Sequence, residues 1–143
     1  MKKMICAVIA LLLIVPAVVS CGAGYSLDAR ALAEYLQYFD RPEELPIIAF
    51  EKAEFKGAVY YYLDRGPYEP DDEASVKMIL VYDVASKTFK NNFWLDMEYG
   101  LRPEVLEQWK KRDKEAKSVH IFTRAEIDDL VKEAIEYCNL LKK

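Results

Sequence analysis

An uncharged stretch near the start of the chain decides how much of the sequence is left to fold. Two early lysines are followed by residues 4–19, sixteen residues without a charged side chain. A positive start, an apolar middle and small residues at the end are the layout of a secretory signal. The stretch is shorter than the ~20 residues that cross a bilayer as a helix, and Pro16 interrupts it. We therefore expect residues 1–20 to be a signal that is removed on export.

The last residues of this stretch form a short motif, Val18-Val19-Ser20-Cys21. It resembles the lipobox of bacterial lipoproteins, in which branched and small residues precede an invariant cysteine. The resemblance covers only the N-terminal stretch. It implies that Cys21 becomes the first residue of the mature chain and carries a diacylglycerol on sulfur, often with a further acyl chain such as palmitate on its amino group. Two or more chains give stable membrane attachment. Gly22, where the family has Asp in inner-membrane members, implies the outer membrane in a host with two membranes.

Two other outcomes remain open at this stage. An ordinary secretory signal would be cut near Ala23 or Gly24, and an uncleaved signal would act as an anchor. The cysteines distinguish these alternatives, because Cys6 leaves with the signal and only Cys21 and Cys138 remain. A disulfide between those two would exclude a lipid on Cys21. We expect Cys138 to be a buried thiol, since it lies on the apolar stripe of a helix.

The remaining sequence predicts one domain. Residues 21–26 form the lipid site and a short tether, and residues 27–143 are enough for a single core. Removing residues 1–20 leaves 18 basic and 24 acidic side chains and a formal charge of −6. This acidic balance argues against a nucleic-acid partner.

The order of periodic segments predicts an α+β fold. We expect a helix at 27–39, strands at 47–50, 55–63, 75–83, 88–95 and 118–122, a second helix from Pro103 and a last helix after Thr123. Thr123 and Glu126 have the spacing of a capping box. Residues 51–54 fit either one bulged strand or a tight hairpin. The predicted architecture is two-layered, with a mainly antiparallel sheet of four or five strands packed against about three helices.

Few residues carry recognisable chemistry. His120 is the only histidine, which excludes most zinc sites, and its apolar neighbours place it on a strand. The acidic run at 68–73 lacks the spacing of an EF-hand and is typical of a solvated loop. The sequence therefore predicts no metal site, no cofactor and no assembled catalytic set.

Aromatic residues are dense around the second strand. Tyr60 and Tyr62 share one face of a strand and Tyr61 points to the other. Together with Tyr68 and Trp94 they form the candidate binding surface, for a protein, a peptide or a glycan. One of the two strand faces is expected to belong to the core.

These observations favour a membrane-tethered binding or interaction module of the bacterial cell envelope, with a non-catalytic role. Its partners would be the membrane, through lipid on Cys21, and an envelope protein or glycan. Two alternatives stand beside it. One is a small envelope hydrolase that uses His120 or the acidic loop. The other is a secreted inhibitor or immunity-type protein, which would fit the small size and acidic charge.

Overall fold

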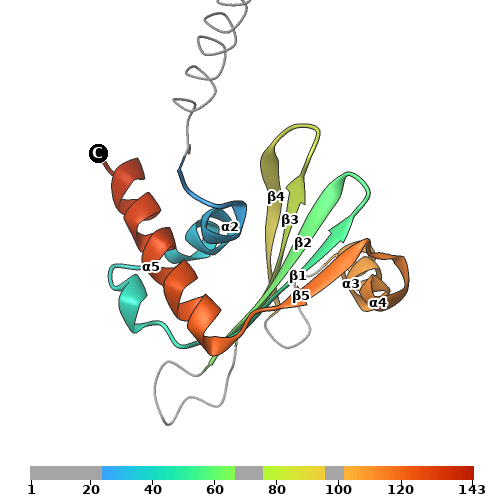
Figure 1. Ribbon diagram of the computed structural model, residues 1–143, viewed down its shortest axis with the longest axis horizontal. Helices are drawn as coiled ribbons and strands as arrows, with labels where there is room; N and C mark the ends of the chain where they lie inside the picture. Colours follow the sequence, from blue (N-terminus) through green and yellow to red (C-terminus); the bar gives the residue numbers. More distant parts are fainter. Residues whose placement is uncertain (1–23, 67–75, 96–101) are drawn as a thin grey trace, which may run out of the picture.

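The computed structural model describes residues 24–66, 76–95 and 102–143 (Figure 1). Within these ranges the chain forms helices and strands in the order α2 (Leu27–Leu36), η1 (Pro42–Glu44), β1 (Ile47–Phe55), β2 (Ala58–Arg65), β3 (Val76–Asp83), β4 (Thr88–Leu95), α3 (Pro103–Lys110), α4 (Arg112–Glu115), β5 (Ser118–Ile121) and α5 (Arg124–Leu141).

The strands form one sheet in the order β4-β3-β2-β1-β5, and every neighbouring pair is antiparallel. The first four strands are each paired with the next one along the chain. Strand β5 comes after α3 and α4 in the sequence and pairs with β1. Opposite residues in an antiparallel pair share a face. The register therefore defines a first face that carries Tyr61 and Lys52, and a second face that carries Tyr62 and Glu51.

Helices α2 and α5 pack side by side on the first face (Figure 1). The largest cluster of buried side chains lies between them and the sheet. Its fully buried members include Tyr35, Leu32, Leu36, Phe50, Tyr61, Leu63, Met78 and Leu80. Helices α3 and α4 lie on the second face, where a smaller cluster holds Ala53, Phe55, Ile79, Val105 and Trp109.

Local signals explain where the helices on the first face begin. The hydroxyl of Ser26 accepts a hydrogen bond from the backbone N–H of Ala29 and caps α2. At α5, the Thr123 hydroxyl accepts from the N–H of Glu126, and the Glu126 carboxylate accepts from the N–H of Thr123. This reciprocal pair is the predicted capping box, which is confirmed.

The predicted α+β class, with an antiparallel sheet and about three helices, is confirmed. The hairpin alternative for residues 51–54 is wrong, and several boundaries differ, including that of β2, which begins at Ala58 instead of residue 55. Residues 51–54 belong to the continuous strand β1, and the turn lies at Lys56 and Gly57, where the positive φ of 82° suits glycine. The first helix ends at Leu36, and the second is divided into α3 and α4 at Lys111.

Candidate functional site

The predicted aromatic surface is divided between the two cores. Tyr61 has no exposed surface, and its ring stacks on Phe50 with centroids 5.5 Å apart. The inclusion of Tyr61 in an exposed surface is therefore wrong. The alternation of side chains along β2 was predicted. Which face is buried depends on where the helices pack, and α2 and α5 cover the face that carries Tyr61.

Tyr60 and Tyr62 lie on the second face, where α3 covers much of their surface. The Tyr62 ring stacks on the ring of Trp109 in α3, with ring centroids 5.6 Å apart. The guanidinium of Arg112, in α4, lies 4.4 Å from the centre of the Trp109 ring. Tyr60 packs edge-on against Phe55. Both tyrosines are half-buried. Burial raises the pKa of each phenol, with Glu104 contributing at Tyr60 and Asp64 at Tyr62.

The other predicted site residues fall outside what the structure describes. Cys21 and Tyr68 lie in the ranges 1–23 and 67–75, and the acidic run 68–73 lies there too. The backbone of Trp94 belongs to β4 and pairs with Met78, but the description does not extend to its side chain.

A row of polar residues, which was not predicted from the sequence, crosses the first face. Tyr61, Lys52 and His120 are in register on the neighbouring strands β2, β1 and β5. Asp28, in the first turn of α2, lies over this row. Its carboxylate accepts a hydrogen bond from the Tyr61 hydroxyl at 2.7 Å and from the Lys52 ammonium at 3.1 and 3.2 Å. One feature of the sequence could have indicated this row: Lys52 lies two positions after Phe50, so its charged side chain shares a strand face with an apolar core residue.

The Asp28 contacts bind helix α2 to the sheet. The side chains of Asp28 and Lys52 are 20% and 24% exposed, so the ion pair lies at the edge of the core. Burial raises the pKa of Tyr61, and the hydrogen bond to Asp28 raises it further. The phenol therefore stays protonated and acts as a permanent donor to the carboxylate. This arrangement stabilises a helix position, and the three groups satisfy one another.

His120 forms a second polar pair at the outer end of the row. Its Nε2 lies 3.2 Å from both carboxylate oxygens of Glu126, and its ring packs edge-on against Phe122. The pKa of Glu126 is lowered, first by the Thr123 backbone N–H and then by His120. Within ranges 24–66, 76–95 and 102–143, no hydroxyl or thiol is hydrogen-bonded to His120. Among these described residues, no hydroxyl or thiol is in place to complete a hydrolytic triad with the pair.

Among the residues that the structure describes, open hollows border η1 on two sides. The larger, of about 520 Å³, is lined by Phe39, Asp40, Arg41, Glu44, Leu45 and Arg65. The smaller, of about 350 Å³, lies between η1 and α5. Arg41 is paired with Glu44 at the rim of the first hollow. In the described part of the chain, no three histidine, cysteine, aspartate or glutamate residues are grouped to hold a metal ion.

Strand β5 forms one edge of the sheet. All four of its residues are exposed, including the apolar side chains of Val119 (38%) and Ile121 (67%). Phe122 donates its backbone N–H to the carbonyl of Phe50, so the Phe50–Phe122 and Lys52–His120 pairs are the hydrogen-bonded ones. Hydrogen-bonded and non-bonded pairs alternate along an antiparallel ladder. The backbone groups of Val119 and Ile121 therefore point away from β1, at the outer edge of the sheet.

Cys138 is 3% exposed, and the prediction that it is a core thiol is confirmed. Its Sγ lies 3.8 Å from the carbonyl oxygen of Ala33 in α2, and burial raises its pKa. A buried thiol with a raised pKa is a poor nucleophile.

Comparisons with protein-family models, with curated proteins and with solved structures find no match for this chain. Among the helices that the structure describes, none combines the length and the apolar character needed to cross a bilayer.

Proposed function

We propose that this chain is an exported lipoprotein of the bacterial cell envelope, anchored through lipid on Cys21, whose α+β domain binds a partner and performs no catalysis. The anchoring rests on the two early lysines, the uncharged stretch 4–19 and the lipobox-like Val18-Val19-Ser20-Cys21. In a host with two membranes the location is the outer membrane.

The binding role rests on one observation, the uncovered edge of β5. An exposed edge strand presents unpaired N–H and C=O groups to another chain, and proteins commonly protect such edges with charge, proline or a covering segment. The two residues of β5 whose backbone N–H and C=O groups point away from β1 are Val119 and Ile121, and both have exposed apolar side chains. The partner is therefore an extended segment of an envelope protein that adds a strand beside β5.

The side chains of β5 give this edge two different sides. Ile121 and Val119 lie on the second face, next to Glu51 and Ala53 of β1, whereas His120 lies on the first face beside Lys52. An added strand would gain backbone hydrogen bonds from the edge and apolar contact on one side. Apolar residues at alternate positions of the partner would fit that side.

Neither alternative function has an observation of this kind in its favour. The hydrolase would use His120, which is paired with a capping carboxylate, or the acidic run at 68–73, which lies outside the described residues. An inhibitor or immunity-type protein would also act by binding, and the experiment below would identify its target.

A proline at position 119 tests the binding role. The Val119 N–H points away from β1, so proline removes an outward donor without removing a hydrogen bond inside the sheet. The matched control is Val119→Ala, which shortens the same side chain and keeps the N–H. Each variant carries a photo-crosslinking residue at Ile121 and is expressed in the host.

We expect Val119→Ala to retain a crosslinked envelope protein and Val119→Pro to lose it. Circular dichroism of both variants checks that the fold is intact. If both variants crosslink the same proteins as the parent, or if the parent crosslinks none, binding through β5 is wrong.

A further inference from the structure

The first described residues are fixed to the last helix. The ring of Tyr25 packs on that of Tyr137, with centroids 5.2 Å apart. The backbone N–H of Ser26 donates to Oε1 of Glu133 at 2.6 Å, and its hydroxyl donates to Oε2 at 3.2 Å. The chain therefore enters the domain at a defined place, beside the C-terminal half of α5.

The lipid site is covalently close to this place. Three residue steps separate Cys21 from Gly24, and an extended chain spans at most about 3.6 Å per residue, or roughly 11 Å here. A lipid on Cys21 would hold this end of the domain against the bilayer. The inference that follows rests on the proposed anchoring.

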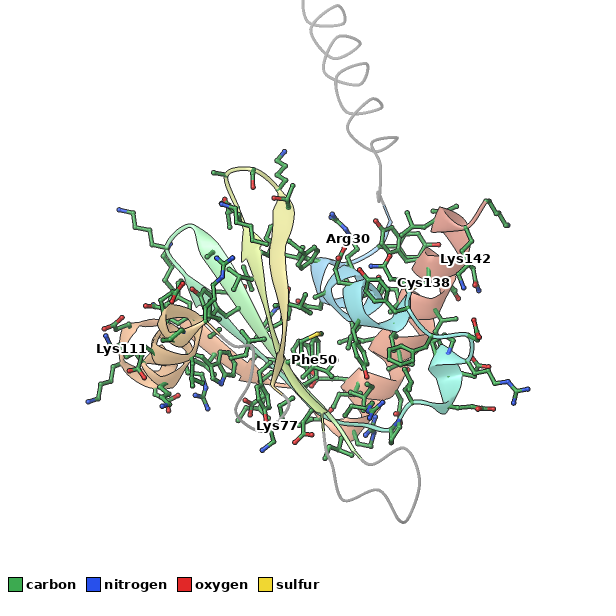
Figure 2. All side chains as sticks on the ribbon, turned by 180° about the vertical axis from the view of Figure 1, so that it is seen from behind. Arg30, Phe50, Lys77, Lys111, Cys138 and Lys142 are labelled. Carbon is green, nitrogen blue, oxygen red and sulfur yellow. The ribbon has the colours of Figure 1, made fainter. Side chains whose placement is uncertain are left out.

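Two exposed elements lie at the same end of the molecule as this entry point. In Figure 1 the C-terminal end of α5 and the turn between β3 and β4 both lie at the top, on either side of the point where the described chain begins. Helices α3 and α4 lie lower, on the far side of the sheet. Figure 2 shows Lys142 and Lys111 on opposite sides of the molecule.

Both elements combine apolar and basic side chains. At the end of α5, Leu140 and Leu141 are 50% and 53% exposed, and two lysines follow them. At the β3–β4 turn, Val84 is 48% exposed and Lys87 lies three residues further on.

The charges at this end suit an anionic surface. Lys87, Lys142 and Lys143 form no ion pair with any residue that the structure describes, although the whole chain has a formal charge of −4. The neighbouring carboxylates are partly engaged. Glu133 binds Ser26 and Asp83 pairs with Lys90, while Glu136 stays exposed.

Hydrogen bonds support the backbone of the turn between β3 and β4. Oδ1 of Asp83 accepts hydrogen bonds from the backbone N–H groups of Ala85 and Ser86. The N–H of Val84 donates to the carbonyl of Gly57, which joins this turn to the one between β1 and β2.

We propose that these two elements form a bilayer-contacting surface, made of Leu140, Leu141, Lys142 and Lys143 on α5 and Val84 and Lys87 on the turn. The apolar side chains enter the boundary between lipid headgroups and acyl chains, and the ammonium groups bind lipid phosphates. Contact at two separated elements fixes the orientation of the domain. Strand β5 lies at the opposite edge of the sheet from β4 and stays accessible to its partner.

Site-directed labelling of the lipidated full chain tests this surface. An environment-sensitive fluorophore is attached to a cysteine introduced by Leu141→Cys or Val84→Cys, and to Lys111→Cys as the control on the far side. Cys138 is 3% exposed, so the parent should take up no label. The proteins are reconstituted in vesicles of phosphatidylethanolamine and phosphatidylglycerol that contain a lipid brominated on its acyl chains.

We expect the labels at 141 and 84 to shift to shorter wavelength and to be quenched by the brominated lipid, and the label at 111 to show neither effect. Intact mass of the same samples reports acylation. Acylated protein whose labels at 141 and 84 behave like that at 111 overturns the bilayer contact and leaves the anchoring intact. Protein without acyl mass overturns both. A shift that persists in detergent and grows with protein concentration indicates a second copy on this surface, and also overturns the bilayer contact.

Discussion

The two faces of the sheet are stabilised in different ways. The first face is covered by α2 and α5, and it buries Phe50 completely between Tyr61 and Phe122, with ring centroids 5.5 and 4.8 Å away. The second face is covered by the short helices α3 and α4. There Trp109 lies between Tyr62 and Arg112 in a smaller buried cluster, and the side chains packed around that cluster are only partly buried.

Polar contacts sharpen the difference. On the first face Asp28 joins α2 to Lys52 and Tyr61, and the Tyr61 hydroxyl is part of the core. On the second face the hydroxyls of Tyr60 and Tyr62 form no hydrogen bond with any residue that the structure describes. The first face should therefore determine global stability, and the second should open with less effect on the rest of the domain.

Truncation of Phe50 should have the largest effect. Phe50→Ala removes a fully buried ring that stacks on two others, and we expect the free energy of unfolding to fall by about 4 kcal/mol. Urea denaturation followed by circular dichroism measures it. A loss below about 2 kcal/mol would contradict the central position of this ring.

Trp109→Ala should cost less, about 3 kcal/mol, because the cluster around it is small and partly solvated. Amide hydrogen exchange should accelerate first in α3 and α4, while α2 and α5 keep their protection. Equal acceleration in α5 would show that the two faces unfold as one unit.

Tyr61→Phe removes one donor to Asp28 and leaves the ring in place. We expect a loss of about 1–2 kcal/mol, since the bond is to a charged group but Lys52 remains paired with the same carboxylate. Tyr62→Phe is the matched control on the second face and should change stability by less than about 0.5 kcal/mol. Identical values for the two variants would remove the proposed difference in polar contacts.

Alkaline pH should reveal the same difference with a smaller effect. The pKa of Tyr61 in the folded protein is raised above the ordinary 10.0 by burial and by Asp28. A folded state that holds its proton more tightly is stabilised below pH 10, and this contribution declines as pH rises above 10 and the unfolded phenol ionises. The stability of Tyr61→Phe should therefore decline less steeply above pH 10 than that of the parent. A slope equal to that of the parent would contradict the assignment.

Local patterns allowed much of the fold to be predicted. The capping box at Thr123 depends on residues three positions apart, and the spacing of Cys138 along the apolar stripe of α5 placed it in the core. The antiparallel pairing of β3 and β4 agrees with the predicted sequence of strand, short turn and strand.

Long-range arrangement explains what was missed. Alternation placed Tyr61 and Tyr62 on opposite faces, but which face α2 or α3 would cover depends on packing between distant segments. Asp28 and Lys52 are 24 residues apart, and no local rule pairs them. Strand β5 is an edge strand because it pairs only with β1, and the order of the strands in the sheet could not be predicted from the sequence.

The intact mass of the mature protein from its own host tests the central claim of envelope anchoring most directly, with Cys21→Ala as the control. We predict a chain that begins at Cys21 and carries the added mass of acyl chains, and no such mass in Cys21→Ala. A chain cut beyond Cys21, an uncut chain, or a Cys21 without lipid would contradict the account.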